Sequence, residues 1–224
     1  MRDPTGVRMT RTALACAVLI ATAYATASWL THGFAVWTAE GARRLAVAEQ
    51  PVAAPAARLR GSGVERGNLV DLLTQPGRVT LLNFVYTRCA SVCLAMGSEF
   101  QQLQRALAQR PPPAQPIALL SISIDPLHDD IAALQQAAWR WRADPAHWRF
   151  VGVPDAAELQ RLLVAFQVTV IADGAGGYEH NAALLVIDDH GRLVRIFEVD
   201  ETAAALAYAD WLSQPARQRA RSPG

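Results

Sequence analysis

The sequence predicts an α/β domain that follows an N-terminal transmembrane helix. Short apolar runs rich in β-branched residues alternate with segments whose apolar residues repeat at helical spacing, and a long uncharged apolar run precedes them. The 224 residues suffice for one domain with its own core. A formal net charge of +1 creates no field that would gather nucleic acid, so no nucleic-acid partner is expected. The chain contains no lysine, which excludes Schiff-base, P-loop and serine–lysine chemistry.

Residues 12–30 are the predicted transmembrane signal anchor. This uncharged run is about as long as a bilayer is thick and follows three arginines. Because a positive flank stays in the cytoplasm, residues 1–11 are expected to be a cytoplasmic N-terminus. The chain would then cross a bacterial inner membrane once and place its domain in the periplasm. Residues 25–27 read Ala-Thr-Ala, so a cleaved signal peptide is the alternative to the retained anchor that we favour.

Three further segments differ in composition. Residues 31–62 are rich in alanine, proline and arginine and lead into a Gly-Ser-Gly sequence, which predicts a flexible tether. Residues 63–213 form the predicted domain. Residues 214–224 are polar, rich in arginine and interrupted by proline, which predicts a disordered tail.

Strands and helices alternate within the predicted domain. Five apolar runs predict strands, at residues 78–86, 117–124, 148–153, 182–188 and 192–198. Apolar residues at helical spacing predict helices over residues 96–107, 131–141, 159–166 and 202–212. The last two strands are separated by Asp-His-Gly, which predicts a hairpin. This order of alternating elements, then a hairpin and a final helix, fits a thioredoxin-like fold.

Cys89 and Cys93 are the candidate reactive groups. Cys89 follows an apolar run almost directly, so we expect it at the carboxyl end of a central strand, where open α/β sheets bind ligands. Cys93 begins the next helix, whose N-terminal dipole favours a thiolate, and Arg88 adds positive charge nearby. Three intervening residues separate the two sulfurs by about one helical turn, which suits a bridging metal ion at least as well as a disulfide.

Three motifs follow one another in a defined order. The first is FVYTRCASVC at residues 84–93, the second is SIDP at residues 123–126, and the third is YEH at residues 178–180, with LLVID at residues 184–188. Together they closely resemble the Sco family of membrane-tethered, thioredoxin-fold copper proteins, which assist the assembly of cytochrome c oxidase. The resemblance spans roughly residues 64–212.

The resemblance implies a ligand set. Cys89, Cys93 and His180 would bind copper, and Asp125 would lie behind the ligands or face a partner. The donor chemistry agrees, because two thiolates suit Cu(I) and one imidazole allows the same site to hold Cu(II). A thioredoxin-type reductase is expected to place a proline opposite its cysteines, but residues 167–188 contain none. His180 therefore favours a copper site over a simple reductase.

Some positions depart from the family or have weaker roles. Ala90 and Leu94 stand where the family usually has prolines, which loosens the start of the helix without removing a ligand. His128 lies near Asp125 in the sequence and is a reserve ligand. Cys16 opens the predicted transmembrane run and is expected to be an apolar filler.

The sequence leaves more than one function open. The leading hypothesis is a copper-binding assembly factor, not a turnover enzyme, that serves the copper-bearing subunit of cytochrome c oxidase or exchanges copper with another chaperone. The alternative is a thiol-disulfide oxidoreductase that keeps the copper-ligand cysteines of a partner reduced. A structural zinc site is a third possibility, but two cysteines and one histidine leave a tetrahedral ion one ligand short.

Overall fold

The computed structural model describes residues 4–34, 36–62, 64–89, 92–110, 116–174 and 176–214. These residues belong to two units, residues 1–45 and 46–224. The first unit contains helix α1 (Pro4–Leu30), and helix α2 (Ala39–Glu49) runs from the first unit into the second. Within α1, the segment Met9–Leu30 is long and apolar enough to cross a membrane, which agrees with the predicted anchor.

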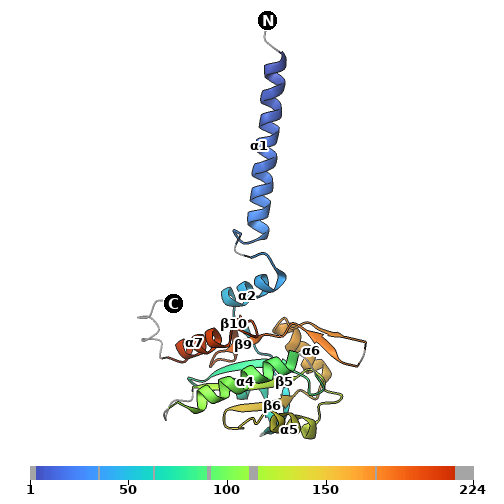
Figure 1. The fold of residues 1–224 in the computed structure, drawn as a ribbon, viewed down its shortest axis with the longest axis vertical. Coiled ribbons are helices and arrows are strands. Elements are labelled where there is room, and N and C mark those ends of the chain that lie inside the picture. The colour runs from blue at the N-terminus through green and yellow to red at the C-terminus, as the bar shows by residue number, and fades with distance from the viewer. Residues whose placement is uncertain are drawn as a thin grey trace. The chain divides into compact units, whose positions relative to one another are not determined.

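An eight-stranded mixed sheet organises the second unit (Figure 1). Its strands are β1 (Val52–Ala53), β2 (Arg58–Gly61), β3 (Val64–Asn68), β4 (Val79–Val85), β5 (Ile117–Ser123), β6 (Trp148–Gly152), β9 (Leu184–Ile187) and β10 (Arg192–Phe197). The strand order is β1-β10-β9-β4-β5-β6-β2-β3. Strands β4, β5 and β6 run parallel to one another, and the remaining neighbours are antiparallel. Strand β4 is therefore central, with β5 on one side and β9 on the other.

Helices pack on both faces of this sheet. They are α3 (Leu69–Leu73), α4 (Val92–Ala108), α5 (Ile131–Arg140), α6 (Ala156–Ala165) and α7 (Thr202–Ser213). Residues of α3 and α6 belong to one buried cluster, and residues of α4, α5 and α7 belong to another. Each cluster joins one face of the sheet to its helices, which is the three-layer arrangement of an α/β domain.

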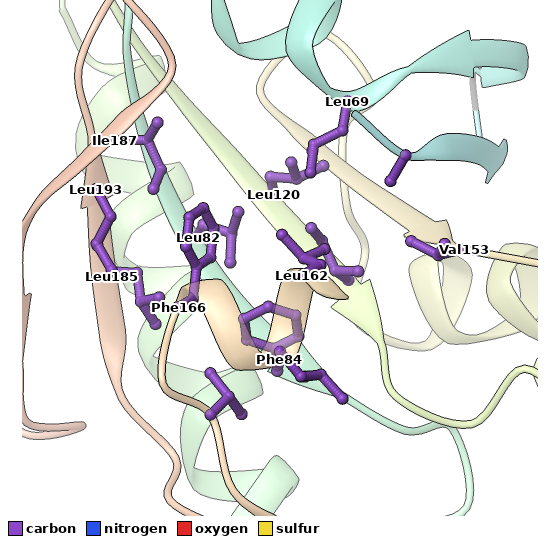
Figure 2. Packing of buried hydrophobic residues seen from close by; sticks show 14 of the residues in the cluster. Leu69, Leu82, Phe84, Leu120, Val153, Leu162, Phe166, Leu185, Ile187 and Leu193 are labelled. Atoms are coloured by element: carbon purple, nitrogen blue, oxygen red, sulfur yellow. The ribbon is translucent and has the colours of Figure 1, made fainter. Parts of the chain in front are cut away.

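Every residue of β4 is buried, as expected for a central strand that is covered on both faces. Leu82 and Phe84 belong to the first cluster, and Leu81 and Val85 belong to the second, because side chains alternate along a strand. Phe84 meets Phe166 edge to face, with 6.5 Å between ring centroids (Figure 2). The end of β4 is thus held firmly from both sides, and the chain leaves it directly toward Cys89.

A second, two-stranded sheet carries His180. It consists of β7 (Val170–Ala172) and β8 (Tyr178–His180), which pair antiparallel with Val170 opposite His180. Asn181 fastens the base of this hairpin, because its Oδ1 accepts from the Thr169 amide at 2.8 Å and its Nδ2 donates to the Gln167 carbonyl at 3.2 Å.

The predicted thioredoxin-like fold is confirmed, and each of the five predicted strands has its counterpart in the structure. The structure differs from the sequence expectation between residues 31 and 62. It forms α2 there, and it pairs β1 with β10 and β2 with β6, so the sheet begins before residue 63. Of the predicted tail, residues 215–224 lie outside the described part of the chain.

Candidate metal centre

Cys89 lies four residues beyond the end of β4. Its amide donates to the Tyr86 carbonyl at 3.2 Å, so the chain turns immediately after the strand. Cys89 is half-buried and packs against the first core cluster, as Val170 and Tyr178 of the β7–β8 hairpin also do. The predicted location at the carboxyl end of the central strand agrees with the structure.

Cys93 is the second residue of α4. This location leaves its backbone in the first turn, where unpaired amides and the helix dipole favour a negative sulfur. The side chains of Cys93 and Leu94 lie outside the described part of the structure, as does Ala90.

His180 ends β8, four residues before β9 begins. Its Nδ1 and Nε2 atoms are both buried, and neither has a hydrogen-bond partner among the described residues. Burial lowers the pKa of His180 below its ordinary value, because desolvation disfavours the imidazolium. The ring is therefore neutral at physiological pH and offers a lone pair, which is the state that a metal ligand requires.

Two hydrogen bonds connect the Cys89 loop to the His180 hairpin. The Tyr86 hydroxyl donates to the Tyr178 carbonyl at 3.2 Å, and Arg88 Nη2 donates to the Gly176 carbonyl at 3.1 Å. The rings of Tyr86 and Tyr178 also meet edge to face at 5.5 Å. These contacts bring together segments about ninety residues apart in the chain, as the predicted ligand set requires.

Asp125 follows β5, at the same edge of the sheet as Cys89. It is 0% exposed, so it does not face a partner directly. Arg88 Nη2 donates to its Oδ2 at 2.9 Å, and His128 Nδ1 lies 2.9 Å from each of its oxygens. Burial opposes ionisation of this carboxyl, but the hydrogen bonds from His128 and Arg88 outweigh it and lower the pKa of Asp125.

Asp129 is a second buried carboxylate at this edge, and the sequence analysis missed it. Its oxygens accept from the Thr87 amide at 3.0 Å, the Thr87 hydroxyl at 2.6 Å and the Ser123 hydroxyl at 2.5 Å. Asp129 thus fixes the residue two positions before Cys89. The sequence feature that could have identified Asp129 is the group of polar side chains at the ends of two adjacent apolar strands.

The described residues hold a different group of metal-capable side chains at the β9–β10 turn. Asp188, Asp189 and His190 have ligand atoms within 4.8 Å of one another. The Asp188 carboxylate already accepts from the amides of His190 and Arg192 and from the Arg192 guanidinium. We therefore interpret this group as hydrogen bonding within the turn.

The cavity beside Cys89 is small. It has a volume of about 30 Å³ and is lined by Cys89, Asn83 and Trp148 among others. Larger clefts of about 470 and 520 Å³ are lined by other residues, with Arg60 and Pro154 common to both. Neither of these larger clefts is lined by Cys89 or His180, and a single ion needs no cleft of that size.

The fold and the site together define a thioredoxin-like domain whose cysteines follow the central strand. The SCO1/SenC family model matches residues 64–210, and the chain belongs to this family. No match was found among the curated proteins.

Solved structures of the Sco family resemble the chain. Copper-bound ScoI of Bradyrhizobium japonicum is 25% identical with a TM-score of 0.57, covering 70% of this chain and 99% of that one. Copper-bound yeast Sco1 is 16% identical with a TM-score of 0.58, covering 77% and 96%. BsSco, described as a cytochrome c oxidase assembly protein with a disulfide switch, is 17% identical with a TM-score of 0.62, covering 73% and 95%.

Proposed function

We propose that this protein binds one copper ion through Cys89, Cys93 and His180 and helps to assemble the copper site of cytochrome c oxidase. Membership of the SCO1/SenC family supports this function, as do relatives that were solved with copper bound. The partner would be the copper-bearing oxidase subunit or another copper chaperone. The metal would be cargo that leaves by exchange of ligands.

The observation that carries the proposal is the state of His180. With no hydrogen-bond partner among the described residues, this buried, neutral imidazole costs free energy, about 1–3 kcal/mol for each polar group left unsatisfied. A metal ion would satisfy one of its nitrogens. Thiolates hold Cu(I) and imidazole adds affinity for Cu(II), so this donor set suits both oxidation states.

The protein's own residues would prepare the site for the ion. The N-terminus of α4 would stabilise the thiolate of Cys93, and the hydrogen bonds of Tyr86 and Arg88 would keep the His180 hairpin beside the Cys89 loop. Asp125 would act behind the ligands, because it is buried and paired with Arg88.

We also propose a location for the domain. Residues 12–30 would remain as the anchor, with residues 1–11 in the cytoplasm and the copper-binding domain in the periplasm. The apolar segment of α1 and the arginines that precede it support this topology. Such a compartment allows thiols to be oxidised, which any exchange between thiol and disulfide states requires.

The second candidate function is reduction of a disulfide in the copper-site cysteines of a partner. The location of Cys89 after β4 and of Cys93 at a helix N-terminus favours it, since both features promote thiolate attack. A Cys89–Cys93 disulfide would form as the partner disulfide breaks. Two electrons and two protons would pass to the partner.

Copper loading of the reduced, full-length protein in detergent tests the proposal. We expect one Cu(I) per chain and, with Cu(II), an intense thiolate-to-copper absorption band. Cys89→Ser and Cys93→Ser should each abolish the band. Cys16→Ser is the matched control, because it removes a cysteine of α1, and it should leave the band unchanged. Failure to bind copper, with turnover of the disulfide by a reductant, would instead support the second function.

A further inference from the structure

Arg88 connects the end of β5 to the tip of the β7–β8 hairpin. Its Nη2 atom donates to Asp125 Oδ2 at 2.9 Å and to the Gly176 carbonyl at 3.1 Å. An Nη2 group carries two hydrogens, so these two acceptors use both of them. One side chain of the Cys89 loop therefore reaches the hairpin that carries His180.

The Asp125 end of this connection is held in place. Asp125 is fully buried, and its amide donates to the Ser123 hydroxyl at 3.0 Å. His128 Nδ1 lies 2.9 Å from the Asp125 oxygens and 2.9 Å from Arg88 Nη2. Because a carboxylate only accepts, Nδ1 donates to Asp125 in the tautomer that carries its proton there, and it accepts from Arg88 Nη2 in the other tautomer. In either tautomer His128 braces the ion pair.

The hairpin that carries His180 needs support from outside itself. It has only two strands of three residues each, and an isolated two-stranded hairpin is marginally stable in water. Its tip approaches the Cys89 loop closely, since a Cβ on Gly177 would lie 3.1 Å from the Tyr86 hydroxyl. Contacts at this tip therefore decide how well the orientation of β8 is defined.

We infer that Arg88 is a positioning residue: braced by Asp125, it fastens the β7–β8 hairpin so that His180 stays beside the Cys89 loop. Asp125 would act on the site through Arg88, not as a ligand or a partner contact. The consequence for copper affinity rests on the proposed function, but the fastening itself does not require copper.

Hydrogen exchange on the copper-free, full-length protein tests the fastening directly. In Arg88→Met we expect the amides of β8 to exchange about tenfold faster, because local opening loses a charge-assisted hydrogen bond. Arg192→Met is a matched control. The two arginines are similarly exposed, Arg88 at 44% and Arg192 at 49%, and each pairs with a buried aspartate, Asp125 and Asp188 respectively. Arg192, however, lies at the β9–β10 turn. Arg192→Met should leave β8 exchange unchanged.

A double-mutant cycle tests the route through Asp125. Tyr178 of β8 also interacts with Asp125, so the cycle is measured in a Tyr178→Phe background, where Asp125→Asn alone should still speed exchange in β8. Combined with Arg88→Met, Asp125→Asn should increase the β8 exchange rate little further, because both changes break the same connection. Additive effects would overturn the inference. So would unchanged β8 exchange in Arg88→Met, or an equal effect of Arg192→Met.

Copper binding provides the second measurement. Arg88→Met should weaken Cu(II) binding roughly tenfold, which is within the range seen when a group behind a metal ligand is lost. Cu(I) binding should weaken less. If β8 exchange rises while Cu(II) affinity is unchanged, Arg88 fastens the hairpin but does not position a ligand, which refutes the inference. If the unaltered protein binds no copper, the proposed function fails, and the exchange result still decides whether Arg88 fastens the hairpin.

Discussion

Replacement of His180 by leucine should make the copper-free protein more stable and the copper-bound protein less stable. The unaltered protein buries both ring nitrogens of His180 without a described partner. Leucine has a similar volume and no polar atoms, so His180→Leu removes an unsatisfied group without opening a large cavity. The stability order of the two proteins should therefore reverse when copper is added.

The expected magnitudes follow from this burial. Relief of the unsatisfied imidazole is worth about 1–2 kcal/mol, which raises the Tm of a domain of this size by roughly 3–6 °C. Loss of a ligand should weaken Cu(II) about 100-fold or more, since loss of a group behind a ligand already costs about 10–100-fold. At saturating copper, a 100-fold loss removes about 2.7 kcal/mol of the stabilisation that the ion provides. Binding of Cu(I), which depends on the thiolates, should weaken much less.

Thermal unfolding by circular dichroism, with and without Cu(II), measures both effects. His147→Leu is the control: its Nδ1 bonds Asp144 Oδ2 at 2.9 Å and only its Nε2 is buried without a described partner, so this variant should gain less stability than His180→Leu and keep its copper affinity. A copper-free His180→Leu protein that is less stable than the unaltered one by more than about 1 kcal/mol would refute the reasoning. Equal stabilisation of both proteins by Cu(II) would remove His180 from the site.

Three further outcomes are expected. Gly177→Ala should weaken Cu(II) binding about tenfold, because its Cβ would lie 2.5 Å from Asp173 Oδ2 and 3.1 Å from the Tyr86 hydroxyl. Equilibrium titration measures this, and an unchanged Cu(II) affinity would contradict it. The pKa of Asp125 is lowered in the folded state, so its ionised carboxylate should stabilise the protein fully above about pH 4, the pKa of the unfolded chain, and this stabilisation should be lost as the pH falls through the folded pKa. The urea midpoints of Asp125→Asn and the unaltered protein should therefore converge in acid. A difference that stays constant with pH would contradict this. Removal of α1 should release the protein from membranes on fractionation, and continued membrane retention would contradict its role as the anchor.

The main strands could be predicted because a buried strand appears in the sequence as a continuous run of mostly apolar residues. Residues 79–85 are mostly apolar and bounded by turn residues, and the strand they form is buried on both faces. The location of Cys89 then follows, since whatever comes directly after a central parallel strand lies at its carboxyl edge.

Short and half-exposed strands could not be predicted in the same way. Strand β2 alternates buried and exposed residues over only four positions and includes two arginines, so it looks like polar tether sequence. Strands β7 and β8 have three residues each and little burial. Their pairing depends on contacts with the rest of the domain, which local propensity does not record.

The arrangement around the ligands was also beyond sequence reasoning. Arg88 was recognised only as a nearby charge, and its bond to Gly176 joins residues 88 positions apart. Asp125 was identified by its motif, but its full burial, which directs its carboxylate to Arg88 and His128, is a property of the packed sheet edge. Such long-range connections depend on the whole fold.

In the proposed site, two thiolates and one imidazole bind the same copper ion. X-ray absorption at the copper edge of the loaded, full-length protein, combined with electron spin-echo spectroscopy of its Cu(II) form, counts these donors directly. We expect two sulfur neighbours and a single histidine nitrogen, with the nitrogen signal lost in His180→Leu and kept in His147→Leu. One sulfur, no imidazole, or a nitrogen signal that survives in His180→Leu would contradict it.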